Sequence, residues 1–300
     1  MNNGEIAFCC VQRRNAVTPE ELSELTGWQG VLSFAMVGPW TLAATLTVST
    51  LIVSSLIVSG SAVAMVGGAT PADDGIARSL VMVVGSRANG GSVCTGAALA
   101  RDLILTAAHC VAPGATYSVL PAKNAPAVAI KSIHVHPRYD PQSYALNRAT
   151  ADVALIKLAV ALPERFVPVA LENASTAVAV GDRFTIAGFG VTAAGSGNGI
   201  GLARSASLVA TGQPGTLQIR LFDPATKGDR PGLGACTGDS GGPMLRDVDG
   251  RLVVIGVVSW STGPKLGAGC GGLTGVTPLE RYRDWIVQAA GKLGSPVVAS

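Results

Sequence analysis

Three residues of the types used in nucleophilic catalysis occur in the order His109, Asp152 and Ser240. His109 ends the apolar run LTAAHC, Asp152 begins ADVALIKL, and Ser240 lies in the glycine-rich CTGDSGGP. A serine hydroxyl is too weakly acidic to attack a carbonyl at neutral pH, so it needs a base and a carboxylate that orients the imidazole. Each segment alone is also typical of a turn or a strand end. Together they predict a serine nucleophile with its base.

The motifs TAAHC, DVALIKL, GDSGGP and SW occur in this order and resemble those of the chymotrypsin/trypsin family of serine endopeptidases. The resemblance spans about residues 65–290 and implies that His109 is the general base, Asp152 orients it and Ser240 attacks the scissile carbonyl. It also implies an oxyanion hole made by the backbone N–H groups of Gly238 and Ser240. We therefore expect a serine endopeptidase that forms an acyl-enzyme. The alanine- and glycine-rich composition favours a bacterial member.

An all-β fold is expected, because short β-branched runs recur between turn residues and the 300-residue chain contains 38 glycines. The resemblance implies two packed six-stranded antiparallel Greek-key β-barrels with a C-terminal α-helix. Within residues 65–292, the expected protease domain, we place the division between the barrels near 163–180; residues 293–300 form a tail. Strands are predicted at 80–85, 102–108, 128–136, 152–158, 182–190, 217–222, 243–247 and 251–260, and a helix at 278–290.

An export signal is expected before the protease domain. The apolar segment at about residues 40–58 carries no charge and is long enough to span a bilayer, and Ala62 and Ala64 are small residues of the kind that signal peptidase reads. We expect residues 1–64 to be an N-terminal extension plus signal peptide, cleaved after Ala64, and the enzyme to be secreted, extracellular or periplasmic. An uncleaved membrane anchor is the alternative, and Met36 is an alternative start of translation.

The residues after the expected cleavage site are Met65-Val66-Gly67-Gly68. In the family that the motifs resemble, the mature chain begins with an apolar residue followed by Val-Gly-Gly. Its α-amino group pairs with the carboxylate before the nucleophile, which is Asp239 here. Cleavage by signal peptidase would therefore free Met65 and activate the enzyme in the same event.

The six cysteines include no Cys-x-x-Cys pair and there are only three histidines, so we expect neither a metal site nor another cofactor. Four cysteines follow the export signal, and an even number in an exported region favours two disulfides. The resemblance implies the pairs Cys94–Cys110 and Cys236–Cys270, both beside the active site.

The primary specificity pocket follows from the resemblance as well. It would be lined by Gly234, Ala235, Ser259, Trp260, Ser261 and Gly275. An acidic residue at its base would select Arg or Lys, but Gly234 stands there. We therefore expect an uncharged pocket that favours apolar side chains. Lys265, in a neighbouring loop, is expected to be solvated.

The formal net charge of +3 gives no concentrated basic face, so nucleic acid is not an expected partner. Expected partners are protein or peptide substrates, with protein inhibitors as further candidates, and we expect a monomer. Contact with a membrane is expected only if the signal stays attached. Two alternatives remain open at this stage: a catalytically inactive homologue that serves as a binding module, and a membrane-anchored protease.

Overall fold

The computed structural model describes residues 65–88, 90–143, 146, 148–173, 177–211 and 217–297. The predictions for the N-terminal extension, its signal peptide and the last three residues of the tail lie outside these ranges. In the described part of the chain, no helix is long and apolar enough to cross a membrane.

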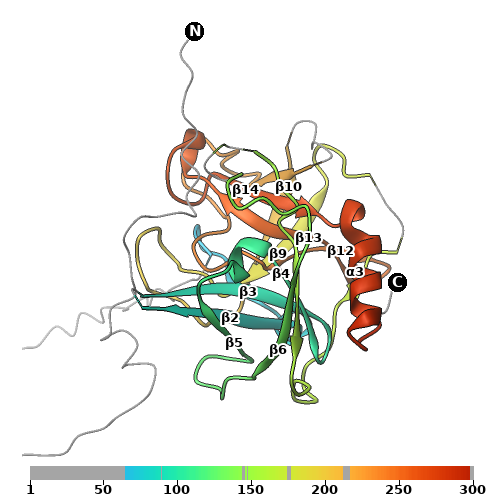
Figure 1. Ribbon diagram of the computed structural model, residues 1–300. Coiled ribbons are helices and arrows are strands. Elements are labelled where there is room, and N and C mark those ends of the chain that lie inside the picture. Colours follow the sequence, from blue (N-terminus) through green and yellow to red (C-terminus); the bar gives the residue numbers. More distant parts are fainter. Residues whose placement is uncertain are drawn as a thin grey trace, which may run out of the picture.

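The first of two sheets is a curled, antiparallel, six-stranded sheet (Figure 1). Its strands follow the order β5 (Thr116–Leu120), β2 (Leu80–Arg87), β3 (Gly90–Ala100), β4 (Leu103–Thr106), β7 (Ala154–Leu158) and β6 (Ile130–Val135). A bridge between Val119 in β5 and Val128, just before β6, draws the two edges of the sheet together. In this order β4 and β7 are neighbouring strands, and neither of them lies at an edge of the sheet.

The second sheet contains a closed barrel. Its strands follow the order β1 (Thr70–Pro71), β10 (Arg204–Ala210), β11 (Ile219–Phe222), β14 (Leu273–Pro278), β13 (Arg251–Ser261), β12 (Pro243–Val248) and β9 (Arg183–Gly188). Pairing of β9 with β10 closes six of these strands, while β1 extends the sheet beyond them. The short β8 (Ala170–Leu171) adds a parallel pairing to β13. The predicted all-β fold is confirmed, with β1 and β8 added to the second set of six strands.

The sequence did not predict β3, although β3 lies between β2 and β4 in the first sheet. Its sequence GGSVCTGAALA consists mainly of small residues, which have little intrinsic preference for strands. The neighbouring strands explain this composition: a Cβ on Gly96 would lie 2.5 Å from Cγ2 of Ile104 and 3.3 Å from Cγ2 of Val81. The packing of β2 and β4 selects small residues where propensity alone predicts a loop.

The C-terminal helix starts later than predicted. Pro278 still belongs to β14, and the N–H of Leu279 donates to the carbonyl of Ile255 in β13, so the chain remains bonded to the sheet there. A 3-10 turn, η3 (Glu280–Tyr282), leads into α3 (Arg283–Lys292). The predicted buried face is present, since Leu279, Tyr282 and Ile286 are at most 4% exposed.

The buried ring of His136 connects α3 to the first sheet. It lies between the rings of Tyr282 and Trp285, each with its centroid 4.9 Å away in an edge-to-face arrangement. Burial and the nearby charge of Arg138 lower the pKa of His136. The neutral ring is therefore the form that the docked helix favours.

The chain after α3 is tied back to the first sheet. Lys157 of β7 is buried, and its Nζ contacts Oδ2 of Asp102 at 2.5 Å and the Oγ of Ser295. The Ser295 hydroxyl also donates to Oδ1 of Asp102 at 2.6 Å. Burial opposes ionisation of Asp102, but these hydrogen bonds and the Lys157 charge lower its pKa overall. Within the predicted tail, Ser295 is thus a buried anchor, 3% exposed.

Two glycine-to-alanine changes should have opposite effects on stability. Gly96→Ala forces Ile104 and its neighbours to shift, so we expect the free energy of unfolding to fall by about 1–3 kcal/mol. Gly291 lies in α3, and the position that a Cβ would take there is open. Gly291→Ala should therefore raise the free energy of unfolding by about 0.5–1 kcal/mol. Urea denaturation of both variants measures this. Equal effects of the two substitutions would contradict the packing explanation for β3.

Candidate active site

His109 and Asp152 lie side by side, although they are 43 positions apart in the sequence. His109 lies in the 3-10 helix η1 (Ala108–Val111), which follows β4, and Asp152 comes just before β7. Antiparallel pairing of β4 with β7 sets Thr106 opposite Ala154, so the end of one strand meets the start of the other. Nδ1 of His109 lies 2.8 Å from Oδ2 of Asp152, and the backbone N–H of His109 donates to Oδ1 at 2.9 Å.

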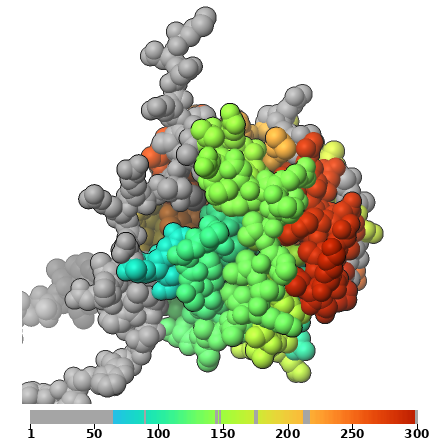
Figure 2. Space-filling view, in the orientation of Figure 1, coloured from blue at the N-terminus to red at the C-terminus, as the bar shows by residue number. Residues whose placement is uncertain are grey.

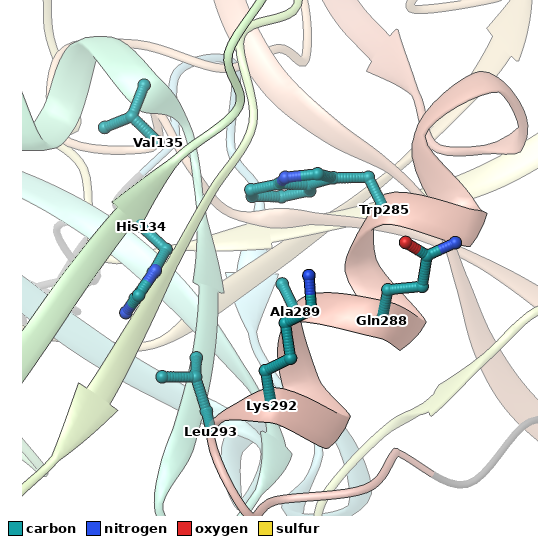
Figure 3. Close-up of a pocket in the computed structure, with 7 residues that line it drawn as sticks. All are labelled: His134, Val135, Trp285, Gln288, Ala289, Lys292 and Leu293. Atoms are coloured by element: carbon teal, nitrogen blue, oxygen red, sulfur yellow. The ribbon is translucent and has the colours of Figure 1, made fainter.

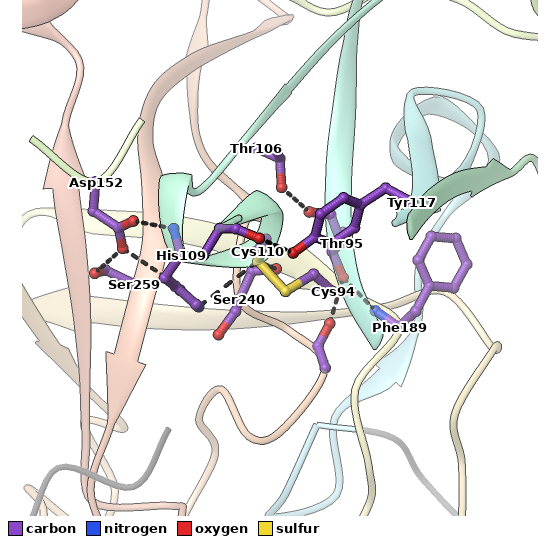
Figure 4. The surroundings of a disulfide bond; sticks show 12 residues. Cys94, Thr95, Thr106, His109, Cys110, Tyr117, Asp152, Phe189, Ser240 and Ser259 are labelled. Carbon is purple, nitrogen blue, oxygen red and sulfur yellow. Dashed lines mark hydrogen bonds and ion pairs between the residues drawn. A yellow bond between two sulfur atoms is a disulfide. The ribbon is translucent and has the colours of Figure 1, made fainter. Parts of the chain in front are cut away.

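Asp152 is only 1% exposed, and its side chain also accepts a hydrogen bond from a residue other than His109. The hydroxyl of Ser259 donates to Oδ2 at 2.6 Å (Figure 4). Sequence analysis assigned Ser259 to the pocket and did not anticipate this contact. A buried carboxylate is stabilised by such donors, and the bonds to both oxygens fix the plane in which the His109 ring is held.

Ser240 is 5% exposed and lies in the turn before β12 (Figure 4). Its carbonyl accepts the N–H of Thr95 at 2.8 Å and lies 3.6 Å from Sγ of Cys110. The same sulfur lies 3.7 Å from Nε2 of His109. Asp152 occupies Nδ1 of His109, and Ser240 lies beside the same ring in Figure 4.

Both predicted disulfides are confirmed. Cys94 is bonded to Cys110 and Cys236 to Cys270. The Cys94–Cys110 bond joins β3 to η1 and so supports the position of His109. Cys94, His109 and Cys110 bring three potential metal-ligand atoms within 4.8 Å, but both sulfurs belong to the disulfide and neither is a thiolate.

Asp239, next to Ser240, is completely buried. Its Oδ1 accepts the N–H of Gly190 at 2.8 Å and its Oδ2 accepts the N–H of Cys236 at 2.9 Å. Burial nevertheless raises the pKa of Asp239 to about 7, against the opposing effect of these hydrogen bonds. The adjacent Gly238 has φ +97°, a left-handed conformation that residues with a Cβ rarely adopt.

The described chain begins inside the second barrel. Met65 is 0% exposed and packs in the barrel core, and Val66 pairs with Gly234 through an isolated bridge. A Cβ on Gly67 would collide with the backbone of Gly232, so only glycine permits this close approach. Met65 itself has φ +52°, which is unusual for a residue with a side chain.

The predicted pocket residues come together at β13 and β14, and all six are buried. Trp260 stands opposite Gly275, and its ring lies against the Cα of that glycine so closely that any Cβ would collide with it. Sequence analysis missed Thr274, whose hydroxyl accepts the N–H of Ala235 at 3.0 Å. The Thr274 hydroxyl would lie 3.4 Å from a Cβ on Gly234. Lys265, in the neighbouring loop, is exposed.

The sequence is also similar to known proteins. The family model described as Trypsin matches residues 66–286. The chain belongs to the trypsin family. It is 31% identical to a trypsin-like protease of Streptomyces glaucescens, over 67% of this chain and 75% of that protein. It is 29% identical to trypsin 5G1 of Aedes aegypti, over 66% of this chain and 75% of that protein.

Membership of the trypsin family identifies the chain as a serine protease, a hydrolase that acts on protein substrates. Trypsin-like proteases are typically secreted, and the two disulfides of the chain fit an extracellular protein.

Loss of the Ser259 hydroxyl should lower activity without abolishing it. Ser259→Ala removes one hydrogen-bond donor to Asp152 and leaves both contacts from His109, so we expect kcat/KM to fall about 10- to 100-fold. Steady-state hydrolysis of a peptide substrate measures this change, with the exposed Ser207→Ala as the matched control. Unchanged kcat/KM in Ser259→Ala would mean that this contact does not support Asp152.

Proposed function

We propose that the protein is a secreted serine endopeptidase in which Ser240 is the nucleophile, His109 the general base and Asp152 the orienting carboxylate. The 2.8 Å contact between Nδ1 of His109 and buried Asp152 carries this proposal. It holds the imidazole with its other nitrogen on the side of Ser240, which is the arrangement that proton transfer from a serine hydroxyl needs.

The reaction divides into two acyl transfers. Oγ of Ser240 attacks the scissile carbonyl carbon while Nε2 of His109 takes its proton, and Asp152 stabilises the imidazolium. The N–H groups of Gly238 and Ser240 stabilise the oxyanion, which the left-handed φ of Gly238 supports. The C–N bond then breaks as His109 protonates the leaving amine. Water, deprotonated by His109, hydrolyses the ester and regenerates Ser240.

We further propose an uncharged primary pocket that favours apolar side chains. Gly234 places no charge at its base, and the Trp260 ring against Gly275 supplies an apolar wall. The nearest polar atom to the base is the Thr274 hydroxyl, which is neutral. Cleavage mainly after Arg or Lys in a peptide library would contradict this assignment.

Activation is proposed to follow cleavage between Ala64 and Met65 by signal peptidase. Met65 is buried in the second barrel, and Asp239 is buried with a raised pKa because its hydrogen bonds do not fully offset the cost of burying its charge. A new α-ammonium group at Met65 would supply the opposite charge to this carboxylate. The φ torsion of Met65 exists only while Ala64 is attached. Cleavage therefore also removes a left-handed torsion that costs about 1–2 kcal/mol.

Labelling with a fluorophosphonate probe tests the nucleophile. We expect the mature protein to be labelled on Ser240, and Ser240→Ala to lose labelling and on the order of a millionfold in kcat. Ser207→Ala, which removes an exposed serine, should label normally. An unlabelled Ser240 in folded, mature protein would favour the inactive homologue instead. A mature mass that includes residues before Met65 would favour the membrane-anchored form.

The pH dependence of stability tests the activation pair. In a chain beginning at Ser61, Asp239 has a pKa of about 7 when folded and about 4 when unfolded. The folded state binds more protons between these values, so the free energy of unfolding should fall as pH rises from 4 to 7, by up to about 4 kcal/mol. In a chain beginning at Met65, the ammonium group lowers the pKa of Asp239 and this loss should disappear.

Urea denaturation of both chains, each carrying Ser240→Ala to prevent self-cleavage, provides the measurement. Groups such as His136 titrate in both chains, so the difference between the two pH profiles isolates Asp239. Identical profiles would contradict the proposed pair between Met65 and Asp239.

A further inference from the structure

A pocket with a volume of about 200 Å³ lies between β6 and α3, separate from the triad (Figure 3). Its floor is apolar and consists of Val135 from the strand and Trp285, Ala289 and Leu293 from the helix segment. In the space-filling view, α3 (red) lies directly against the green part of the chain to which β6 belongs (Figure 2). The pocket is therefore formed where the C-terminal helix meets the edge of the first sheet.

Lys292 supplies a positive charge to this pocket. Its ammonium group runs back along α3 towards Trp285 (Figure 3). Among the residues that the structure describes, no carboxylate lies within 4.0 Å of its Nζ, in contrast to the ion pair of Lys157 with Asp102. No acidic side chain lines the pocket. The positive charge therefore has no anionic partner from the described chain.

The end of α3 does not need the Lys292 ammonium as a cap. The N–H groups of Leu293, Gly294 and Ser295 already donate to carbonyls of the last helical turn, at 3.0–3.1 Å. Two further polar groups, on Gln288 and His134, stand at the rim of the pocket. Nε2 of His134 lies 3.0 Å from the hydroxyl of Ser132, which fixes the ring on the opposite wall from Lys292.

We propose that this pocket binds a small apolar molecule that carries a single carboxylate, such as an aryl- or alkylcarboxylic acid. The apolar part would lie on Trp285, Ala289 and Leu293, and the carboxylate would pair with Lys292 and accept a hydrogen bond from Gln288. A ligand of about ten non-hydrogen atoms in such a shallow site binds with Kd on the order of 1 mM. This proposal does not depend on the peptidase activity.

Titration with phenylacetate, followed in ¹⁵N–¹H spectra of the Ser240→Ala protein, tests the site. We expect the indole N–H signal of Trp285 to shift saturably with Kd near ~1 mM. Phenylacetamide, which has the same shape without the charge, should bind at least tenfold more weakly. The indole signal of Trp260 reports separately on binding at the proposed specificity pocket. A shift confined to Trp260, or equal affinity for the two compounds, would overturn the proposal.

Variants separate the charge from the apolar floor. Lys292→Gln should weaken phenylacetate binding at least tenfold, whereas Lys131→Gln, which removes an exposed charge on β6 outside the pocket, should leave it unchanged. Ala289→Leu fills the floor and should abolish the Trp285 shift while the rest of the spectrum keeps the folded pattern. Unaltered affinity in Lys292→Gln would rule out the carboxylate contact.

Discussion

Burial of the Asp239 carboxylate is the constraint on which the centre of the molecule depends. The side chain is enclosed, and its two oxygens take hydrogen bonds from Gly190 and Cys236. Space for it exists only because the residues around it are small: a Cβ on Gly190 would lie 2.5 Å from its Cγ, and one on Gly188 would collide with its Oδ1. The buried Asp239 thus holds the backbone at Gly190 and at Cys236 in place through these hydrogen bonds.

The turn of residues 238–240, which contains Asp239, is also hydrogen-bonded to the first sheet. The hydroxyl of Thr95 in β3 donates to the carbonyl of Gly238, and its backbone N–H donates to the carbonyl of Ser240, both at 2.8 Å. His109 and Asp152 belong to that same first sheet. Thr95 therefore links the two sheets, and its two hydrogen bonds position the proposed nucleophile Ser240 relative to the sheet that carries His109.

Short sequence motifs predicted the parts of the site that lie within those motifs. These are the histidine, the aspartate and the serine, the glycines beside them and the two disulfides. Contacts that depend on partners distant in the sequence were missed. The Ser259 hydroxyl reaches Asp152, and Thr274 supports Ala235, because β13 and β14 bring them there. The strand β3 was missed for the same reason, since the bulk of its neighbours, rather than its own propensity, selects its residues.

The anchoring of Ser295 has a consequence for biosynthesis. The first sheet is built from residues 80–158, yet its buried Lys157 contacts Ser295 as well as Asp102, and its core includes the buried face of α3. A nascent chain that has been synthesised only as far as β7 therefore still lacks part of the packing of its first sheet.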